Sequence, residues 1–288
     1  MKKKGSTIAL FLIFLVGLGI FSYPTIADRW NYYHASRAIM SYTEAVAKIS
    51  AEEYERLFAA AEDYNRRLTE RGKITHLTEE EEAEYNSLLN IENNGIMGYI
   101  EIPVIQISLP IYHTATEAIL QVAIGHLEWT SLPIGGLSTH AALSGHRGLP
   151  SAELFTNLDR LVEGDQFRIY VLNEILTYEV DQIRIVLPEE VDDLRITPGE
   201  DYITLVTCTP YGINTHRLLV RAHRTQPYFD RGEVHPSADA ILIDPLMVAP
   251  FIAIPLLFLI FFAMFISDGR EGDKKLENEN NRSRDRRQ

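Results

Sequence analysis

The only cysteine of this 288-residue chain, Cys208, ends an apolar run at residues 202–207 that is typical of a β-strand. Arg217 follows after eight intervening residues and opens a second such run. The loop between the two runs contains proline, glycine and asparagine, which favours a turn between neighbouring strands. We therefore expect Cys208 and Arg217 to meet across the mouth of this loop. A guanidinium beside a thiol favours the thiolate and can hold an oxyanion, so the spacing indicates nucleophilic catalysis.

A cysteine nucleophile also needs a partner for proton transfer, which is usually a histidine. His146 lies where a strand-like run ends in a turn flanked by glycines, a common place for functional groups. His216 is the rival because it directly precedes Arg217, and spacing alone does not separate the two. A simpler alternative is that Cys208 is a buried core residue without chemistry. Three further histidines could be core or surface residues: His113, His126 and His140.

The composition excludes several classes of protein. Hydrophobic residues make up 46% of the chain and charged residues 23%, which is ordinary for a globular protein and excludes global disorder. The formal net charge of −13, without a basic stretch in the body of the chain, is unfavourable for binding nucleic acid. A single cysteine excludes an intramolecular disulfide, a zinc ribbon and an iron–sulfur cluster.

The region that must position these side chains has the pattern of an all-β domain. Short strand-like runs are separated by turn signals, without the regular strand–helix alternation of a doubly wound sheet, so we expect a barrel or a sandwich. The expected strands cover residues 99–103, 105–112, 140–144, 166–171, 174–187, 202–207 and 215–223, and helical pieces are expected over 117–123 and 152–161.

A helical region is expected before this domain, over residues 28–89. Apolar and aromatic residues recur there three and four positions apart. Ser50 with Glu53, and Thr78 with Glu81, have the form of capping boxes that begin helices. The pattern breaks at residues 71–73, and residues 90–98 are rich in turn formers.

Two uncharged apolar runs lie near the ends of the chain, at residues 7–23 and 246–266. The first follows three lysines and is expected to be a signal peptide or an uncleaved membrane anchor. The second is long enough to cross a bilayer core of about 30 Å at about 1.5 Å per residue. Basic residues flank the outer ends of both runs, so the positive-inside rule places both termini in the cytoplasm and the middle outside.

Three segments together resemble the sortases, the cysteine transpeptidases of Gram-positive cell surfaces. They are Thr-Leu-Val-Thr-Cys-Thr-Pro at residues 204–210, Asn-Thr-His-Arg-Leu at 214–218 and Leu-Ser-Gly-His-Arg-Gly at 143–148. Other segments are similar to class C, the subgroup that polymerises pilins: residues 98–103, 109–113 and 125–128. The resemblance covers about residues 97–225, and the acidic helical region and the second apolar run are also similar to class C.

The resemblance implies an eight-stranded β-barrel with peripheral helices, an N-terminal helical region and two membrane-spanning segments. The implied limits are an N-terminal signal or membrane segment at 1–27, a helical region at 28–95, the barrel at 96–226, a linker at 227–245, a transmembrane helix at 246–266 and a polar cytoplasmic tail at 267–288.

The resemblance also implies that His146, Cys208 and Arg217 are catalytic, without a metal or other cofactor. Cys208 would attack the Thr–Gly bond of an LPXTG-like sorting signal and form a thioacyl enzyme. His146 would protonate the leaving amine and later deprotonate the incoming one, and Arg217 would position the signal and hold the oxyanion. The implied enzyme is a monomer in the cell membrane, and its partners are pilin subunits that supply the sorting signal and an acceptor lysine.

One departure qualifies this resemblance. Many class C enzymes carry an Asp-Pro-aromatic lid motif that plugs the active site, but residues 28–89 contain no such triplet, and residues 65–74 stand in its place. Residues 24–245 also contain two lysines against fifteen arginines, which is either compositional drift or a means to avoid self-modification by a lysine-accepting enzyme. The alternative functions are a sortase that anchors proteins to peptidoglycan and a catalytically silent, membrane-tethered binding module.

Overall fold

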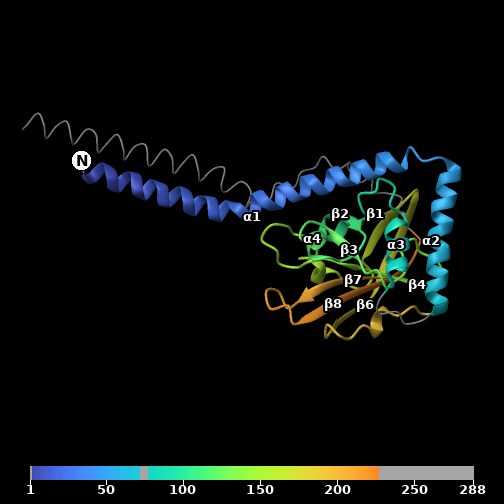
Figure 1. Cartoon of the computed structure of the whole chain (residues 1–288). Helices are drawn as coiled ribbons and strands as arrows, with labels where there is room; N and C mark the ends of the chain where they lie inside the picture. Colours follow the sequence, from blue (N-terminus) through green and yellow to red (C-terminus); the bar gives the residue numbers. More distant parts are fainter. Residues whose placement is uncertain (1, 72–76, 227–288) are drawn as a thin grey trace, which may run out of the picture. The chain divides into compact units, whose positions relative to one another are not determined.

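The computed structural model describes residues 2–71 and 77–226, and three helices precede its sheet. These are α1 (Lys2–Val46), α2 (Ala51–Arg71) and α3 (Glu79–Ser87) (Figure 1). From Phe11 onward, α1 is long and apolar enough to cross a membrane, and it is the one such helix among the described residues. The predicted second span at 246–266 and the tail lie outside the described residues.

Eight strands close into a barrel in the order β1-β2-β3-β4-β7-β8-β6-β5, so the predicted eight-stranded barrel is confirmed. The strands are β1 (Ile96–Ile102), β2 (Ile107–Tyr112), β3 (Ile124–His126), β4 (Thr139–Ser144), β5 (Gln166–Val171), β6 (Glu174–Val186), β7 (Asp201–Thr209) and β8 (His216–Arg224). The pairs β2–β3 and β4–β7 are parallel, and the other neighbouring strands are antiparallel.

Three local expectations differ from the structure. The helix expected over 117–123 is the single turn α4 (Glu117–Leu120), and residues 152–161 form turns that end in a 3₁₀ turn, Leu158–Arg160. The sequence pattern missed β3, whose three residues are all buried and therefore do not alternate. A Cβ at Gly125 would lie 2.2 Å from the carbonyl oxygen of Thr114, so the middle of β3 has room only for glycine.

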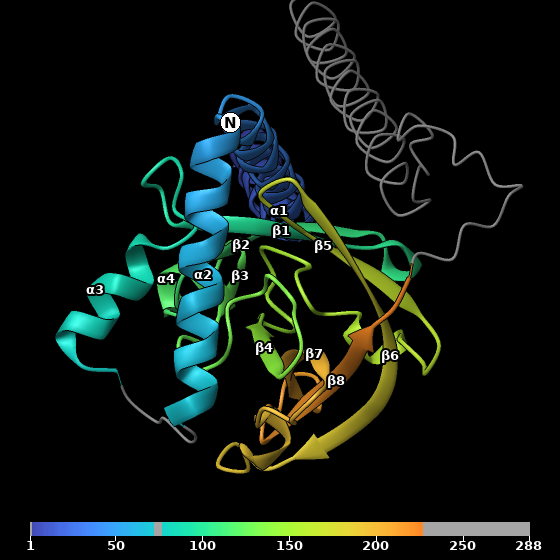
Figure 2. The same ribbon diagram turned by 90° about the vertical axis from the view of Figure 1, so that its right-hand side faces the viewer.

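The barrel interior is filled by apolar side chains from every wall, among them Ile100, Leu143, Phe167, Leu205 and Val220, each at most 1% exposed. The helices extend this core on the outside, because Tyr64 of α2 and Tyr85 of α3 belong to the same buried cluster. Figure 2 shows α2 lying across one side of the barrel with α3 beside it.

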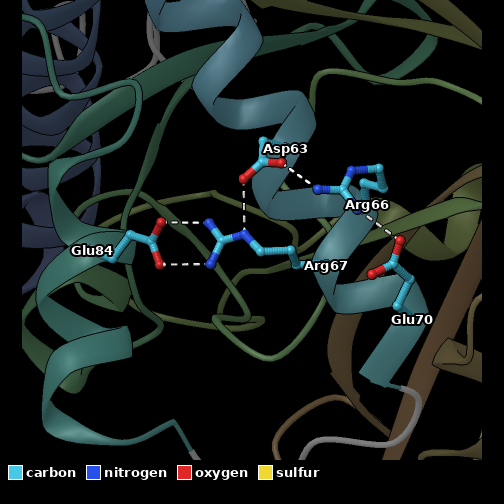
Figure 3. A network of polar contacts seen from close by, with 5 residues as sticks. All are labelled: Asp63, Arg66, Arg67, Glu70 and Glu84. Atoms are coloured by element: carbon cyan, nitrogen blue, oxygen red, sulfur yellow. Dashed lines mark hydrogen bonds and ion pairs between the residues drawn. The ribbon is translucent and has the colours of Figure 1, made fainter.

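Polar contacts fix these helices to the barrel and to each other. Tyr42 of α1 donates its hydroxyl to the carbonyl of Met97 at 3.0 Å and accepts the N–H of Leu172 at 2.7 Å. In the network of Figure 3, the Arg67 guanidinium of α2 binds both carboxylate oxygens of Glu84 in α3, at 3.1 and 2.5 Å. These charges are partly exposed, so the pair contributes little stability and mainly sets the position of α3 against α2.

Candidate active site

The antiparallel pairing of β7 and β8 places Cys208 directly opposite Arg217, as the loop spacing predicted. Cys208 is a free, half-buried cysteine at the end of β7. The Arg217 guanidinium lies over the connecting loop, where Nη1 donates to the carbonyl oxygens of His216 at 3.2 Å and Asn214 at 3.4 Å. Arg217 therefore places a cation at the mouth of the loop, on the residue paired with Cys208.

The parallel pairing of β4 and β7 brings His146 to the same end of the barrel. Ser144 is opposite Val206, and both strands advance in the same direction. His146 and Cys208 each follow two residues later, so they come level with each other. The N–H of Gly145 donates to the carbonyl of Val206 at 3.0 Å, which extends this register one residue past the end of β4. The structure therefore brings His146, Cys208 and Arg217 together at one barrel end.

His216, the rival histidine, lies on the other face of the sheet. It pairs with Thr209, the residue after Cys208, and successive side chains of a strand point to opposite faces. Its Nδ1 contacts the hydroxyl of Thr215 at 2.9 Å. The geometry thus separates the two histidines that spacing could not, and it favours His146.

A carboxylate that sequence reasoning missed adjoins His146. Both carboxylate oxygens of Glu117, in α4, lie 3.4 Å from His146 Nε2. The hydrogen bond from Gln121 and then the contact with His146 lower the pKa of Glu117, so this exposed group is ionised near neutral pH. The two residues are 29 positions apart, and α4 is too short to leave a periodic signal.

Arg147 links the residue after His146 to the residue after Cys208. Its Nη1 donates to the Thr209 hydroxyl at 3.2 Å, and its Nη2 donates to the Asp159 carboxylate at 2.5 Å. The Arg147 side chain is only 9% exposed, whereas that of Asp159 is 47% exposed. The hydrogen bond to Thr209 ties the loop that carries His146 to the end of β7, and the ion pair ties it to the turn Leu158–Arg160.

A small apolar layer supports the site on the outer face of the sheet. Leu127 and Trp129 pack against this layer. Its buried members come from β4, β6, β7, β8 and the β6–β7 connection: Ala142, Val186, Leu194, Val206 and Leu219. Val206 shares a strand face with Cys208, and Leu219 shares one with Arg217, because each pair is two residues apart. The layer is therefore continuous with the candidate site and supports the strands that carry it.

The three histidines left open by the sequence are buried. His126 contacts the Tyr85 hydroxyl at 2.9 Å and the Ser131 carbonyl at 2.7 Å, and burial lowers its pKa to about 4. His113 lies between two backbone carbonyls, and His140 contacts the Thr204 hydroxyl at 2.7 Å. Within residues 2–71 and 77–226, no group of three or more His, Cys, Asp and Glu side chains could hold a metal ion.

The segment in the expected lid position begins at the far end of the barrel. Asn65 of α2 exchanges hydrogen bonds with the backbone of Leu132 at 2.7 and 3.1 Å, and Thr69 donates to the carbonyl of Ser138 at 3.0 Å. Ser138 precedes β4, whose six residues span about 20 Å before His146. Residues 65–71 are therefore remote from Cys208, and the rest of the expected lid position, residues 72–74, lies outside the described residues.

Comparisons with known proteins agree with this geometry. The sortase domain family matches residues 100–225. Sortase C1 from Streptococcus agalactiae is 53% identical, with a TM-score of 0.65, covering 66% of this chain and 99% of that one. Clostridium perfringens sortase C, solved with the C-terminal cell wall sorting motif, is 44% identical, with a TM-score of 0.60, covering 67% of this chain and 100% of that one.

A curated relative, Streptococcus agalactiae sortase A, is 30% identical over 153 residues, or 52% of this chain. The match spans 60% of that relative's length.

Proposed function

The chain belongs to the sortase family of cysteine transpeptidases, and we propose that it is a class C sortase that joins pilin subunits through isopeptide bonds. The observation that carries this proposal is the strand register, which sets Cys208 opposite Arg217 and brings His146 level with Cys208. Sortases of class C are also the structural relatives at 40–53% identity.

The first half of the proposed reaction cleaves the sorting signal. The Cys208 thiolate attacks the threonine carbonyl carbon of the Thr–Gly bond, and Arg217 stabilises the resulting oxyanion. As the carbon–nitrogen bond breaks, the His146 imidazolium gives its proton to the leaving glycine amine. The product is a thioester between Cys208 and threonine.

The second half transfers the threonine. A lysine amine of the next pilin gives a proton to neutral His146 and attacks the thioester carbonyl. The carbon–sulfur bond breaks, the Cys208 thiolate is regenerated, and the threonine is left in an isopeptide bond. Both carboxylate oxygens of Glu117 lie 3.4 Å from Nε2 of His146, and this contact orients the ring for the two proton transfers.

The substrate class, an LPXTG-like sorting signal, is supported by the class C relatives. A related protein, Clostridium perfringens sortase C, was solved with a cell wall sorting motif.

We further propose that the chain crosses the membrane twice. α1 supplies the first span, residues 246–266 the second, and residues 227–245 link the second to the barrel. With both termini cytoplasmic, residues 28–226 lie outside the cell, where pilin subunits emerge.

The test is to incubate the full chain with pilin subunits and to look for ladders of covalent polymers. Cys208→Ala should abolish the ladders, and His146→Ala and Arg217→Ala should each reduce the rate by orders of magnitude. His216→Ala should retain activity, because that side chain lies on the other face of the sheet.

Each alternative predicts a different result. A wall-anchoring sortase would link single subunits to peptidoglycan amines without forming ladders. A silent binding module would form neither product, and its Cys208 would not react with a thiol probe. Loss of activity in His216→Ala but not in His146→Ala would refute the assignment of the base.

A further inference from the structure

The connection between β7 and β8 exposes two large side chains directly beside the proposed active site. Tyr211 is 60% exposed and Ile213 is 68% exposed, and both stand between Cys208 and Arg217 in the chain. Single exposed apolar residues are common on proteins, so their exposure alone carries no conclusion. Their position relative to α1, however, indicates what they contact.

α1 passes along the barrel wall toward the end that holds Cys208. Near its C-terminus, Tyr42 binds the backbone of Met97, at the start of β1. Closer to its N-terminus, Asn31 donates to the carbonyl of Ser151 at 2.8 Å, and Asp28 accepts the N–H of Glu153 at 2.8 Å. These last two contacts are made by the loop that follows His146, so the helix leaves the barrel at the active-site end.

The apolar part of α1 begins close to that point. The helix continues unbroken through Pro24, so Tyr23, the last residue of the uncharged run, lies only about 8 Å along the axis from Asp28. Tyr23, Trp30 and Tyr33 are all more than 50% exposed, and tryptophan and tyrosine are enriched at the interface between lipid and water. With α1 as the membrane span proposed above, Asp28 and the loop bound to it are placed at the bilayer surface.

Tyr211, at the tip of the β7–β8 connection, packs against the loop that follows His146. A Cβ built on Gly148 would lie 3.0 Å from the ring of Tyr211, which therefore rests on the Gly148 backbone. Gly148 belongs to the segment that continues to Ser151 and reaches α1 at Asn31. In Figure 1 the β7–β8 connection, drawn in orange, lies on the side of the barrel toward which the N-terminal half of α1 extends.

We propose that Tyr211 and Ile213, at the tip of the β7–β8 connection, contact the headgroup region of the bilayer that α1 crosses. One isoleucine and one tyrosine form a weak contact by themselves, but α1 already holds the barrel at the surface, so the contact sets orientation rather than attachment. The active-site end then faces the membrane, and the enzyme takes its substrates at the point where they leave the bilayer.

The test places a fluorescent reporter at the loop tip of the full chain in liposomes. The two native tryptophans are replaced (Trp30→Phe and Trp129→Phe), and Ile213→Trp then supplies the only indole. We expect a loss of its fluorescence when the lipids carry nitroxide-labelled headgroups, which quench indole at short range. The matched control is Leu137→Trp in the same background, since Leu137 is 80% exposed and precedes β4 at the opposite barrel end. It should keep its fluorescence.

Equal quenching at both positions, or no quenching at residue 213, would overturn the proposal. Tyr211→Trp in the same background repeats the measurement if Ile213→Trp fails to fold. The readout requires no turnover, so its failure is distinct from a failure of the proposed transpeptidase function.

Discussion

The nearly buried guanidinium of Arg147 makes Asp159 the most informative residue to remove near the active site. Asp159→Ala deletes the carboxylate that accepts from Nη2 at 2.5 Å and leaves a side chain that is 9% exposed without its counter-charge. The contact with the Thr209 hydroxyl at 3.2 Å remains, but a hydroxyl does not neutralise the guanidinium. The variant therefore isolates the cost of an unpaired, nearly buried charge.

The expected cost follows from the exposure of the two partners. A hydrogen bond between charged groups contributes about 1.5–3 kcal/mol, and breaking a fully buried pair costs about 3–5 kcal/mol. Asp159 is 47% exposed, so solvent already screens part of the interaction and the lower range applies. We expect a loss of about 2–3 kcal/mol in the free energy of unfolding, and a melting temperature lower by roughly 5–10 °C.

Thermal unfolding, followed by circular dichroism on the full chain in detergent, measures this loss. Glu163→Ala is the matched control, because it removes an exposed carboxylate from the next turn and should change stability by less than about 0.5 kcal/mol. Arg147→Met with Asp159→Ala should be less destabilised than the sum of the two single variants, since no charge is then left unpaired. Equal stability of Asp159→Ala and Glu163→Ala would refute the argument.

Three further outcomes are expected. Cys208 should label rapidly with a thiol reagent in the resting enzyme, because residues 65–71 are remote from it; slow labelling that is relieved by deleting residues 65–80 would instead reveal a lid. A protease outside intact protoplasts should digest the barrel but spare residues 267–288, and detection of that tail outside would contradict the two-span topology. Arg160→Lys should produce isopeptide-linked self-adducts with a sorting-signal peptide in intact-mass spectra, whereas equal, negligible adducts in the parent and variant would favour compositional drift.

What the sequence could predict depended on how local each contact is. Cys208 and Arg217 are joined by a short loop, so residue types sufficed to place them opposite each other. The choice of His146 over His216 depends on the parallel pairing of β4 with β7, which lie about 60 residues apart and share no local signal. Glu117 and Asp159 reach the site from single helical turns, too short to produce a periodicity.

The helical region before the barrel also depends on contacts that the sequence pattern does not reveal. The pattern predicted helices before the barrel, and the capping box of Thr78 and Glu81 begins α3 as expected. α1 continues through Pro24 to Val46 as one helix, so the apolar run and the start of the helical region belong to a single element. Contacts such as those of Asn31 and Tyr42 with the barrel hold this helix, and a propensity argument does not contain them.

The arginines of the barrel fall into two groups, those that their contacts require and those that a lysine could replace. Residues 96–226 contain eight arginines and no lysine. Arg221 binds both carboxylate oxygens of Asp181, at 3.0 and 2.9 Å, and stacks 4.3 Å from the ring centre of Tyr202, while Arg147 bridges two acceptors. A lysine has neither the planar fork nor the stacking surface for these roles, so geometry alone accounts for arginine there. Avoidance of self-modification can therefore act only at exposed positions such as Arg160, where an ammonium would serve the fold equally well but would also present a nucleophile to the proposed thioester.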